Sequence, residues 1–365
     1  MTRSIIPQQT FEDFKVSFNK LQVQDLFQKY EEMGFIYAAK KALLAPHWQE
    51  ISQNWEKLRE CGEDFLWILG NDQDKSSNFA SVTAWKQSNY GMHAQHLVSN
   101  GNPFLSLRVM LAAQYKAEHH YGQDEVRSSQ NWFRPNNRYA YRVFASMYEK
   151  LGARKAGLRL FQYYKLKLAH IRPIIDSRYE AEEVRNIDPE FIAFVEKQYG
   201  YAFVKAEELD EEDICLEKMD RTFQKKGLRR YRKVFKLREK RTGKIKAALI
   251  INRAPLGINF SFLENRAYYI LDKDMPLNEK NEVLVEMNFH AKAHYEDISI
   301  GAIPIVTDPE HATAIQKQDA VLIREYMQSI WLREGFSQWF EHIDSFLRKI
   351  ESRLNHEMKP GKVAS

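Results

Sequence analysis

Residues 95–152, QHLVSNGNPFLSLRVMLAAQYKAEHHYGQDEVRSSQNWFRPNNRYAYRVFASMYEKLG, decide the fold because the order of their elements occurs twice in the chain. The pattern predicts a strand at 95–98, a turn, a helix at 104–119, a strand at 126–133 and a helix that ends at Gly152. A second copy begins near Tyr268 and extends to Gly335. Repetition of one order predicts a duplicated unit.

Three pairs of matching residues support the duplication. The pairs are Pro103 with Pro276, His120 with His294, and Pro135 with Pro309. Each pair is separated by nearly the same number of residues, which is expected when one unit has been copied. We therefore predict two related units in tandem.

The length of 365 residues exceeds that of one compact core, so two domains are the natural expectation. We expect an N-terminal unit at residues 1–170, a linker at 171–190 that carries Pro173 and Pro189, and a C-terminal unit at 191–365. Each unit places helices first, then a strand meander, a helix, a strand and a helix. This order predicts an α+β fold in which a mixed, mostly antiparallel sheet is flanked by helices.

Three further segments bear on the topology. Residues 158–168 fit either a closing strand or a last helix, and their apolar and basic residues leave both open. Residues 209–224 are predicted as an acidic helix. Residues 312–348 are predicted as a helix that is interrupted near Gly335.

Composition predicts a globular protein without a membrane span. Hydrophobic residues make up 44% of the chain, which excludes a disordered protein. No run approaches the roughly 20 apolar residues that a transmembrane helix needs. The first residues include Arg3, Glu12 and Asp13, unlike a signal peptide. Cys61 and Cys215 are isolated in the sequence, so no disulfide framework is predicted and we expect a cytoplasmic protein.

The late part of the repeat resembles the GCN5-related N-acetyltransferase (GNAT) superfamily. Residues 143–152 are similar to a late GNAT helix in which a tyrosine, here Tyr148, stands four residues before a glycine, here Gly152. Asn137 follows a strand, as an asparagine often does in that family, and Asn102 occupies the place of its pyrophosphate loop. The element order of both halves is similar as well, so the chain resembles a tandem GNAT protein.

The resemblance implies an acyltransfer site in the N-terminal half. Tyr148 would protonate the departing thiolate of coenzyme A. The cofactor contacts would come from the end of a strand, the first turn of a helix and a later loop. These residues are Val98, Ser99, Asn100, Gly101, Asn102, Phe104 and Asn137. The implied donor is acetyl-CoA or a longer acyl-CoA, and the implied acceptor is an amine or another small molecule.

The second copy departs from the family pattern. Its loop at 272–275 contains two acids, Asp272 and Asp274, which would repel a pyrophosphate. Trp331 takes the place of Tyr148, and an indole has no acidic proton to give. We therefore expect a catalytic N-terminal half and a degenerate C-terminal half. The alternative is a non-catalytic tandem module that binds an anionic ligand, nucleic acid or a protein partner.

Two pairs of histidines are candidates for chemistry. His93 and His96 lie in a predicted strand, where residues three apart face opposite sides and cannot share a metal. Either one could deprotonate an amine, or it could be a hydrogen-bonded histidine of the sheet. His290 and His294 have helical spacing but no evident third ligand, so no metal site is predicted.

Residues 225–246 carry twelve lysines and arginines and follow an acidic run at 207–220. The basic run is a candidate site for an anionic ligand or nucleic acid. Alternatively, it forms a half-buried hairpin whose exposed face holds Arg230, Arg232 and Lys236. The acidic helix before it could neutralise this face. The oligomeric state cannot be predicted from these patterns.

Overall fold

The computed structural model describes residues 16–63, 65–71, 79–100, 103–123, 126–172 and 176–357. Its strands are β1 (Ser17–Phe18), β2 (Leu66–Gly70), β3 (Ala80–Lys86), β4 (Gly91–Ser99), β5 (Ser128–Phe133), β6 (Ala156–Lys167), β7 (Tyr179–Glu183), β8 (Tyr231–Glu239), β9 (Ile245–Arg253), β10 (Ala267–Leu271), β11 (Ala302–Thr307) and β12 (Val321–Leu332). Its α-helices are α1 (Val23–Glu32), α2 (Ala38–Leu44), α3 (Trp48–Arg59), α4 (Pro103–Gln123), α5 (Arg138–Ala140), α6 (Tyr148–Leu151), α7 (Pro189–Tyr199), α8 (Tyr201–Ala206), α9 (Glu217–Gln224), α10 (Leu277–Lys292), α11 (Ala312–Gln316) and α12 (Phe336–Glu357).

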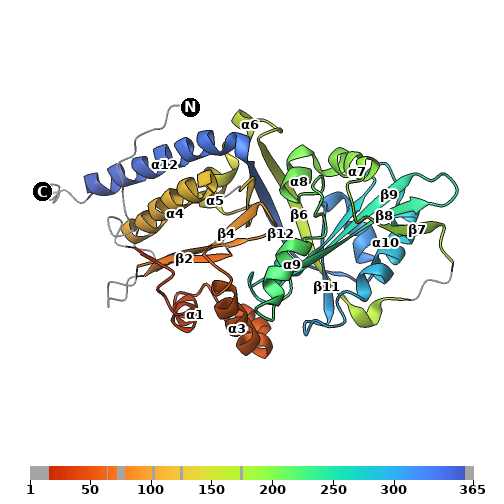
Figure 1. The fold of residues 1–365 in the computed structure, drawn as a ribbon, viewed down its shortest axis with the longest axis horizontal. Coiled ribbons are helices and arrows are strands. Elements are labelled where there is room, and N and C mark those ends of the chain that lie inside the picture. Colours follow the sequence, from red (N-terminus) through yellow and green to blue (C-terminus); the bar gives the residue numbers. More distant parts are fainter. Residues whose placement is uncertain are drawn as a thin grey trace, which may run out of the picture.

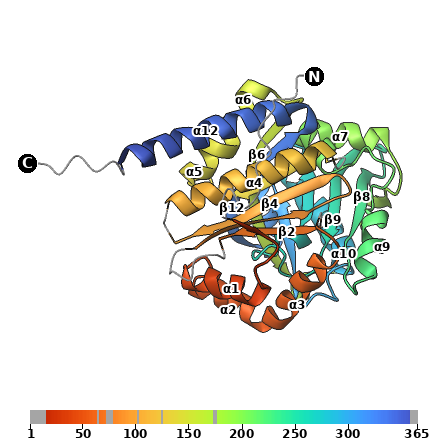
Figure 2. The ribbon, with the colours of Figure 1, turned by 60° about the vertical axis from the view of Figure 1, so that its left-hand side comes forward.

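Within these ranges the strands form one twelve-stranded sheet in the order β1-β2-β3-β4-β5-β12-β6-β11-β10-β9-β8-β7. The pairs β4–β5 and β10–β11 are parallel and the other pairs are antiparallel. Helices flank both faces (Figure 1). In the N-terminal half, α4, α5 and α12 lie on one side of the sheet and α1, α2 and α3 on the other (Figure 2). The predicted α+β class with a mixed, mostly antiparallel sheet is confirmed.

The tandem order is also confirmed by the elements themselves. The series β4, α4, β5, short helices and β6 returns as β10, α10, β11, α11 and β12. Two of the sequence anchors fall at matching places, because Pro103 is the first residue of α4 and Pro276 is the N-cap of α10. Likewise, Pro135 follows β5 and Pro309 follows β11. Proline suits these positions, which precede or begin a helix and need no amide donor.

The last strand of each copy completes the sheet of the other copy. β6 pairs with β11 of the second copy, and β12 pairs with β5 of the first. β6 and β12 also pair with each other in the middle of the sheet. A chain cut at residue 170 would therefore leave the first half-sheet without β12. The segment expected as a linker, 171–190, contains β7, which is the edge strand beside β8.

Two element predictions were wrong. Residues 312–348 were expected to be helical, but they contain β12, so Trp331 lies on a central strand and is not the counterpart of Tyr148. The inner end of β12 is buried on both faces, and such a strand lacks the alternation that distinguishes it from a buried helix. Of the expected acidic helix only α9 is helical, and Glu207 and Glu208 before it are buried. Residues 158–168, which fitted either element, form most of β6.

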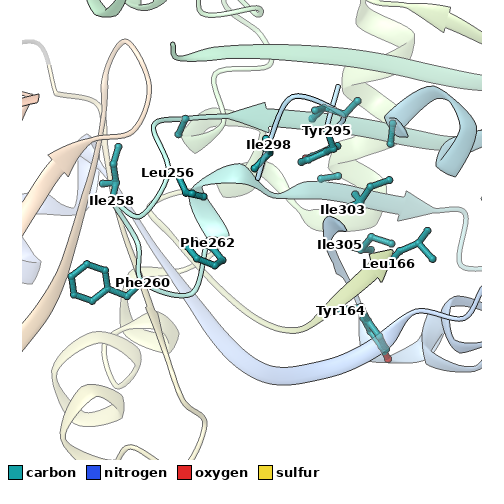
Figure 3. Packing of buried hydrophobic residues seen from close by; sticks show 14 of the residues in the cluster. Tyr164, Leu166, Leu256, Ile258, Phe260, Phe262, Tyr295, Ile298, Ile303 and Ile305 are labelled. Atoms are coloured by element: carbon teal, nitrogen blue, oxygen red, sulfur yellow. The ribbon is translucent and has the colours of Figure 1, made fainter. Parts of the chain in front are cut away.

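The segment 254–266 joins β9 to β10 and packs against α3 of the N-terminal half. Figure 3 shows its side chains Leu256, Ile258 and Phe260 in the hydrophobic cluster that also contains residues of β6 and β11. Trp55 of α3 donates its indole N–H to the carbonyl of Gly257 over 3.0 Å. Gly257 has a φ of +81°, and a Cβ there would lie 2.4 Å from Ile51, so glycine is required. The loop is thereby held against α3.

Candidate functional site

A cavity of about 700 Å³ opens where β4 and β5 separate. The two parallel strands pair only at Gly91–Ser128, Met92–Ser129 and His93–Gln130. Beyond these pairs the strands diverge, and the walls of the cavity include residues 94–97 of β4 and 131–133 of β5. Gln95 spans the gap by donating its side-chain amide to the carbonyl of Trp132 over 3.1 Å. The divergence therefore exposes strand edges to a space of ligand size.

The wall formed by α4 and α12 is mainly apolar. Met110, Ala113 and Ala117 face the cavity at helical spacing from α4, and Trp339 and Ile343 face it from α12. Small alanines on this wall leave room that a larger side chain would fill. Such a surface fits an alkyl chain.

Several wall residues carry a buried polar atom that has no hydrogen-bond partner within the described part of the chain. These atoms are Trp67 Nε1, His96 Nδ1, Gln114 Oε1, Asn131 Nδ2, Trp132 Nε1 and Trp339 Nε1. Buried polar groups in folded proteins are normally paired, so unpaired ones around a cavity indicate a ligand that has polar groups of its own. The walls together fit a long molecule that is apolar in part and carries hydrogen-bonding groups.

His96 lines the cavity, as expected of a candidate base. It has a φ of +57°, and the pairing of β4 with β3 gains one extra residue at this point, which is a β-bulge. Its ring stacks on Phe260 with centroids 4.8 Å apart. Burial, with the charge of nearby Lys40, lowers the pKa of His96 well below its ordinary value, so the ring is neutral at pH 7.

His93 is fully buried and does not line the cavity. Its Nδ1 lies 3.2 Å from Glu264 Oε1 and 3.1 Å from Gln87 Oε1. The expectation that His93 and His96 face opposite sides was wrong. The extra residue of the β-bulge shifts the alternation of side chains along β4, so that both histidines point to the same face of the strand. Both rings contact Trp85, at centroid distances of 5.0 and 5.4 Å.

The expected cofactor residues are only partly brought to the cavity. Asn137 lines it, and its Oδ1 accepts a hydrogen bond from Ala140 N over 3.1 Å, which caps α5. Val98 packs in the hydrophobic core, and Ser99 accepts a hydrogen bond from Ser106. Asn100 donates its backbone N–H to the carbonyl of Phe79, and Phe104 lies half-buried in the first turn of α4. Gly101 and Asn102 lie outside the described residues.

Tyr148, the expected acid, does not line the cavity. It begins α6, after a π-helical turn at Tyr141–Ala145, and packs against the hydrophobic cluster under α4 and α12. The phenols on the cavity wall belong to Tyr37, Tyr139 and Tyr326. Tyr139 is 36% exposed, and its partial burial raises the pKa of the phenol to about 12, so the phenol keeps its proton at neutral pH. A residue from the same helical segment, nine positions earlier in the chain, therefore reaches the place expected for Tyr148.

The corresponding gap in the second half is filled by side chains. β10 and β11 pair only at Ala267–Ile305 and Tyr268–Val306 before they separate. Thr307 then donates its hydroxyl to the carbonyl of Tyr269 over 2.8 Å. Arg159 of β6 lies 3.9 Å from the centre of the Tyr199 ring and donates to Asp308 over 2.8 Å.

A buried ionic cluster, which sequence reasoning missed, lies in the second half and contacts His93 of the first half. It comprises Glu207, Arg230, Arg232, Glu264 and Arg266, all at most 1% exposed. Arg232 and Arg266 both bind Glu207, at 3.0 and 2.9 Å, and Arg230 binds Glu264 at 2.9 Å. Burial alone would raise the pKa of Glu264, but Arg230 and the hydrogen bond from His93 lower it overall. In the sequence Glu207, Arg230 and Arg232 look like exposed members of acidic and basic runs.

The prediction of an exposed face that holds Arg230, Arg232 and Lys236 was wrong, because these three side chains are buried. Seven of the twelve basic side chains in this segment form ion pairs with acids of the chain; they are Lys226, Arg229, Arg230, Arg232, Lys233, Lys236 and Arg238. An anionic ligand at this segment stays a prediction.

Among the described residues no group of His, Cys, Asp and Glu is arranged to hold a metal ion. In the same ranges, none of the helices has the length and apolar character of a membrane span.

No protein-family profile matches the sequence, and the curated proteins give no match. Solved structures similar to this chain include three acyltransferase-related proteins. A GCN5-related N-acetyltransferase from Sphaerobacter thermophilus has 12% identity and a TM-score of 0.43, covering 87% of this chain and 96% of that one. A tandem GNAT protein from the clavulanic acid biosynthesis pathway has 9% identity and a TM-score of 0.37, covering 87% and 98%. Saccharomyces cerevisiae N-myristoyltransferase with bound myristoyl-CoA has 8% identity and a TM-score of 0.35, covering 90% and 80%. At this level of similarity the fold argument rests on the topology described above.

Proposed function

We propose that this chain is an acyltransferase that takes an acyl group from acyl-CoA in the cleft between β4 and β5. The observation that carries the proposal is the cavity of about 700 Å³ at the point where these strands separate. Its apolar wall supports binding of an alkyl chain, and its unpaired polar atoms support binding of amide and thioester groups. The filled gap in the second half supports a structural role for that half.

In this proposal the reaction joins an amine nitrogen to the thioester carbon, and the carbon–sulfur bond breaks. Asn131 and Trp132 can donate hydrogen bonds to the carbonyl oxygen as it gains charge. His96, neutral because burial lowers its pKa, can accept the proton of the amine. Tyr139 can give a proton to the departing thiolate, a role that the family resemblance assigns to Tyr148.

A second candidate function is a binding module that holds acyl-CoA without transferring the acyl group. The position of Tyr148 away from the cavity favours it. The two candidates differ in turnover and agree on binding.

The experiment is a calorimetric titration with acetyl-, octanoyl- and hexadecanoyl-CoA, followed by a thiol-release assay with a panel of amines. We expect binding that tightens with chain length, because each buried methylene contributes about 0.8 kcal/mol. Thiol release that depends on an amine supports transfer, whereas binding without release supports the module. Absence of binding by all three donors at saturating concentration contradicts both.

A further inference from the structure

We propose that the cleft takes an acceptor with an anionic group, a carboxylate or a phosphate, and that Lys40, Arg134 and Arg324 bind this group. The inference rests on the proposed function and adds the chemical class of the second substrate.

The three cations come from three separate elements and meet at one cavity. Lys40 lies in α2, Arg134 follows β5 and Arg324 lies in β12, and all three line the cavity wall. Burial, together with the charges of Arg134 and Arg324, lowers the pKa of Lys40 to about 8, which agrees with their closeness. The fold therefore collects positive charge at one place on the wall.

None of these cations forms an ion pair with a carboxylate of the residues that the structure describes. Lys40 Nζ lies over the Phe35 ring at 4.3 Å and over the Tyr37 ring at 5.5 Å. Arg324 donates to the Tyr37 hydroxyl over 3.3 Å. Lys40 and Arg324 are half-buried and Arg134 is exposed, whereas the fully buried Arg230 and Arg232 have acid partners. Like charges that face one cavity repel each other, and an anion between them would relieve the repulsion.

Lys40 lies on the side of the cleft that the acceptor would use. Lys40 belongs to α2, which packs on the opposite side of the sheet from α4 and α12 and their apolar wall (Figure 2). The cavity has walls from both sides, so it passes through the gap between β4 and β5. Lys40 also acts on His96, the proposed base, by lowering its pKa. An anionic group bound here would bring a nearby amine to His96.

The chemistry of these side chains suits a small planar or tetrahedral anion. Two guanidinium groups offer paired N–H donors, which match the oxygens of a carboxylate or phosphate. An amine acceptor without negative charge would leave three unpaired cations beside it. The site therefore selects acceptors by charge, whereas the apolar wall selects the donor by length.

The test measures binding of phenylacetate and phenyl phosphate, with phenylacetamide as the neutral analogue, to the full-length protein. We expect both anions to bind about tenfold or more tightly than the amide. Lys40→Met, Arg134→Gln and Arg324→Gln should each remove most of this preference. The matched controls are Lys41→Met, next to Lys40 but paired with Glu31, and Arg138→Gln, which lies outside the cavity wall. Equal binding of anion and amide, or equal losses in the controls, would overturn the inference.

A second arm identifies the source of the anion. Each variant is titrated with octanoyl-CoA and with octanoyl-pantetheine, which has no phosphate. We expect both affinities to stay within about twofold of the unmodified protein, because the cations serve the acceptor. Weaker binding of octanoyl-CoA alone would assign the cations to the donor phosphates and overturn the acceptor assignment. If neither thioester binds, the proposed function fails. The titration with phenylacetate and phenyl phosphate still decides whether Lys40, Arg134 and Arg324 bind an anion.

Discussion

The two halves of the sheet separate their parallel strands in the same way, yet the two gaps differ in content. Between β4 and β5 the gap holds a cavity lined by small residues such as Ala113 and by unpaired polar atoms. Between β10 and β11 Thr307 bonds across the gap, and Arg159 lies nearby among Tyr199, Phe203 and Tyr268. Duplication supplied two equivalent gaps, and a few side chains decide which one remains open. A copied backbone therefore does not by itself predict two sites.

Filling the open gap should produce the largest effect. In Ala113→Phe an aromatic ring would occupy the apolar wall. We expect acyl-CoA affinity to fall by about a thousandfold, roughly 4 kcal/mol, because the acyl chain loses its space. The melting temperature should not fall much, since the ring enters a cavity rather than a packed core. Calorimetry and thermal unfolding measure both; retained affinity would show that the ligand lies elsewhere.

Emptying the filled gap should affect stability instead. Arg159→Leu removes the partner of Asp308 and of the buried Gln328, to which Arg159 Nη2 donates over 2.9 Å. We expect the free energy of unfolding to drop by about 3 kcal/mol, because a largely buried carboxylate loses its partner. Urea denaturation measures the drop. Acyl-CoA affinity should be unchanged, and a parallel loss of affinity would contradict the separation of the two gaps.

Removing each phenol hydroxyl in turn should show which tyrosine is the proton donor at the open gap. Tyr139→Phe removes a hydroxyl on the cavity wall, whereas Tyr148→Phe removes one outside it. If Tyr139 is the proton donor, kcat should fall by about a hundredfold in the first variant and by less than about threefold in the second. Steady-state thiol release measures both. The reverse order would return the acid role to Tyr148.

Titrating the cations should give the smallest effect. Burial, then the charges of Arg134 and Arg324, lowers the pKa of Lys40 to about 8. Lys40 therefore loses its charge as the pH rises from 7 to 9. The groups that face it are Arg134, Arg324, the Tyr37 ring and the neutral His96. Phenylacetate, ionised throughout, should bind several-fold more weakly at pH 9. The same titration of Lys40→Met should be nearly flat, and a flat profile in the unmodified protein would contradict the role of Lys40.

The sequence predicted the repeat because its signals are local. The strand expected at 267–271 is β10, and prolines mark the starts of α4 and α10. The pairing of β6 with β11 of the second copy, and of β12 with β5 of the first, could not be predicted, because strands that are far apart in the chain leave no local signal of their pairing. Burial on both sides concealed β12, and buried pairing concealed the role of Glu207. In the site, the resemblance pointed to the half that holds the cavity and to Asn137, which lines it. The bulge at His96 and the reach of Tyr139 depend on packing against Phe260 and α12.

Hydrogen exchange with and without octanoyl-CoA compares the two gaps in one measurement. Amides at 94–97 and 131–134 lie at the open gap, and those at 269–271 and 307–308 lie at the filled one. The account predicts that saturating octanoyl-CoA slows exchange at the first pair of segments and leaves the second pair unchanged. Slower exchange at the second pair alone, or no change at either, would contradict it.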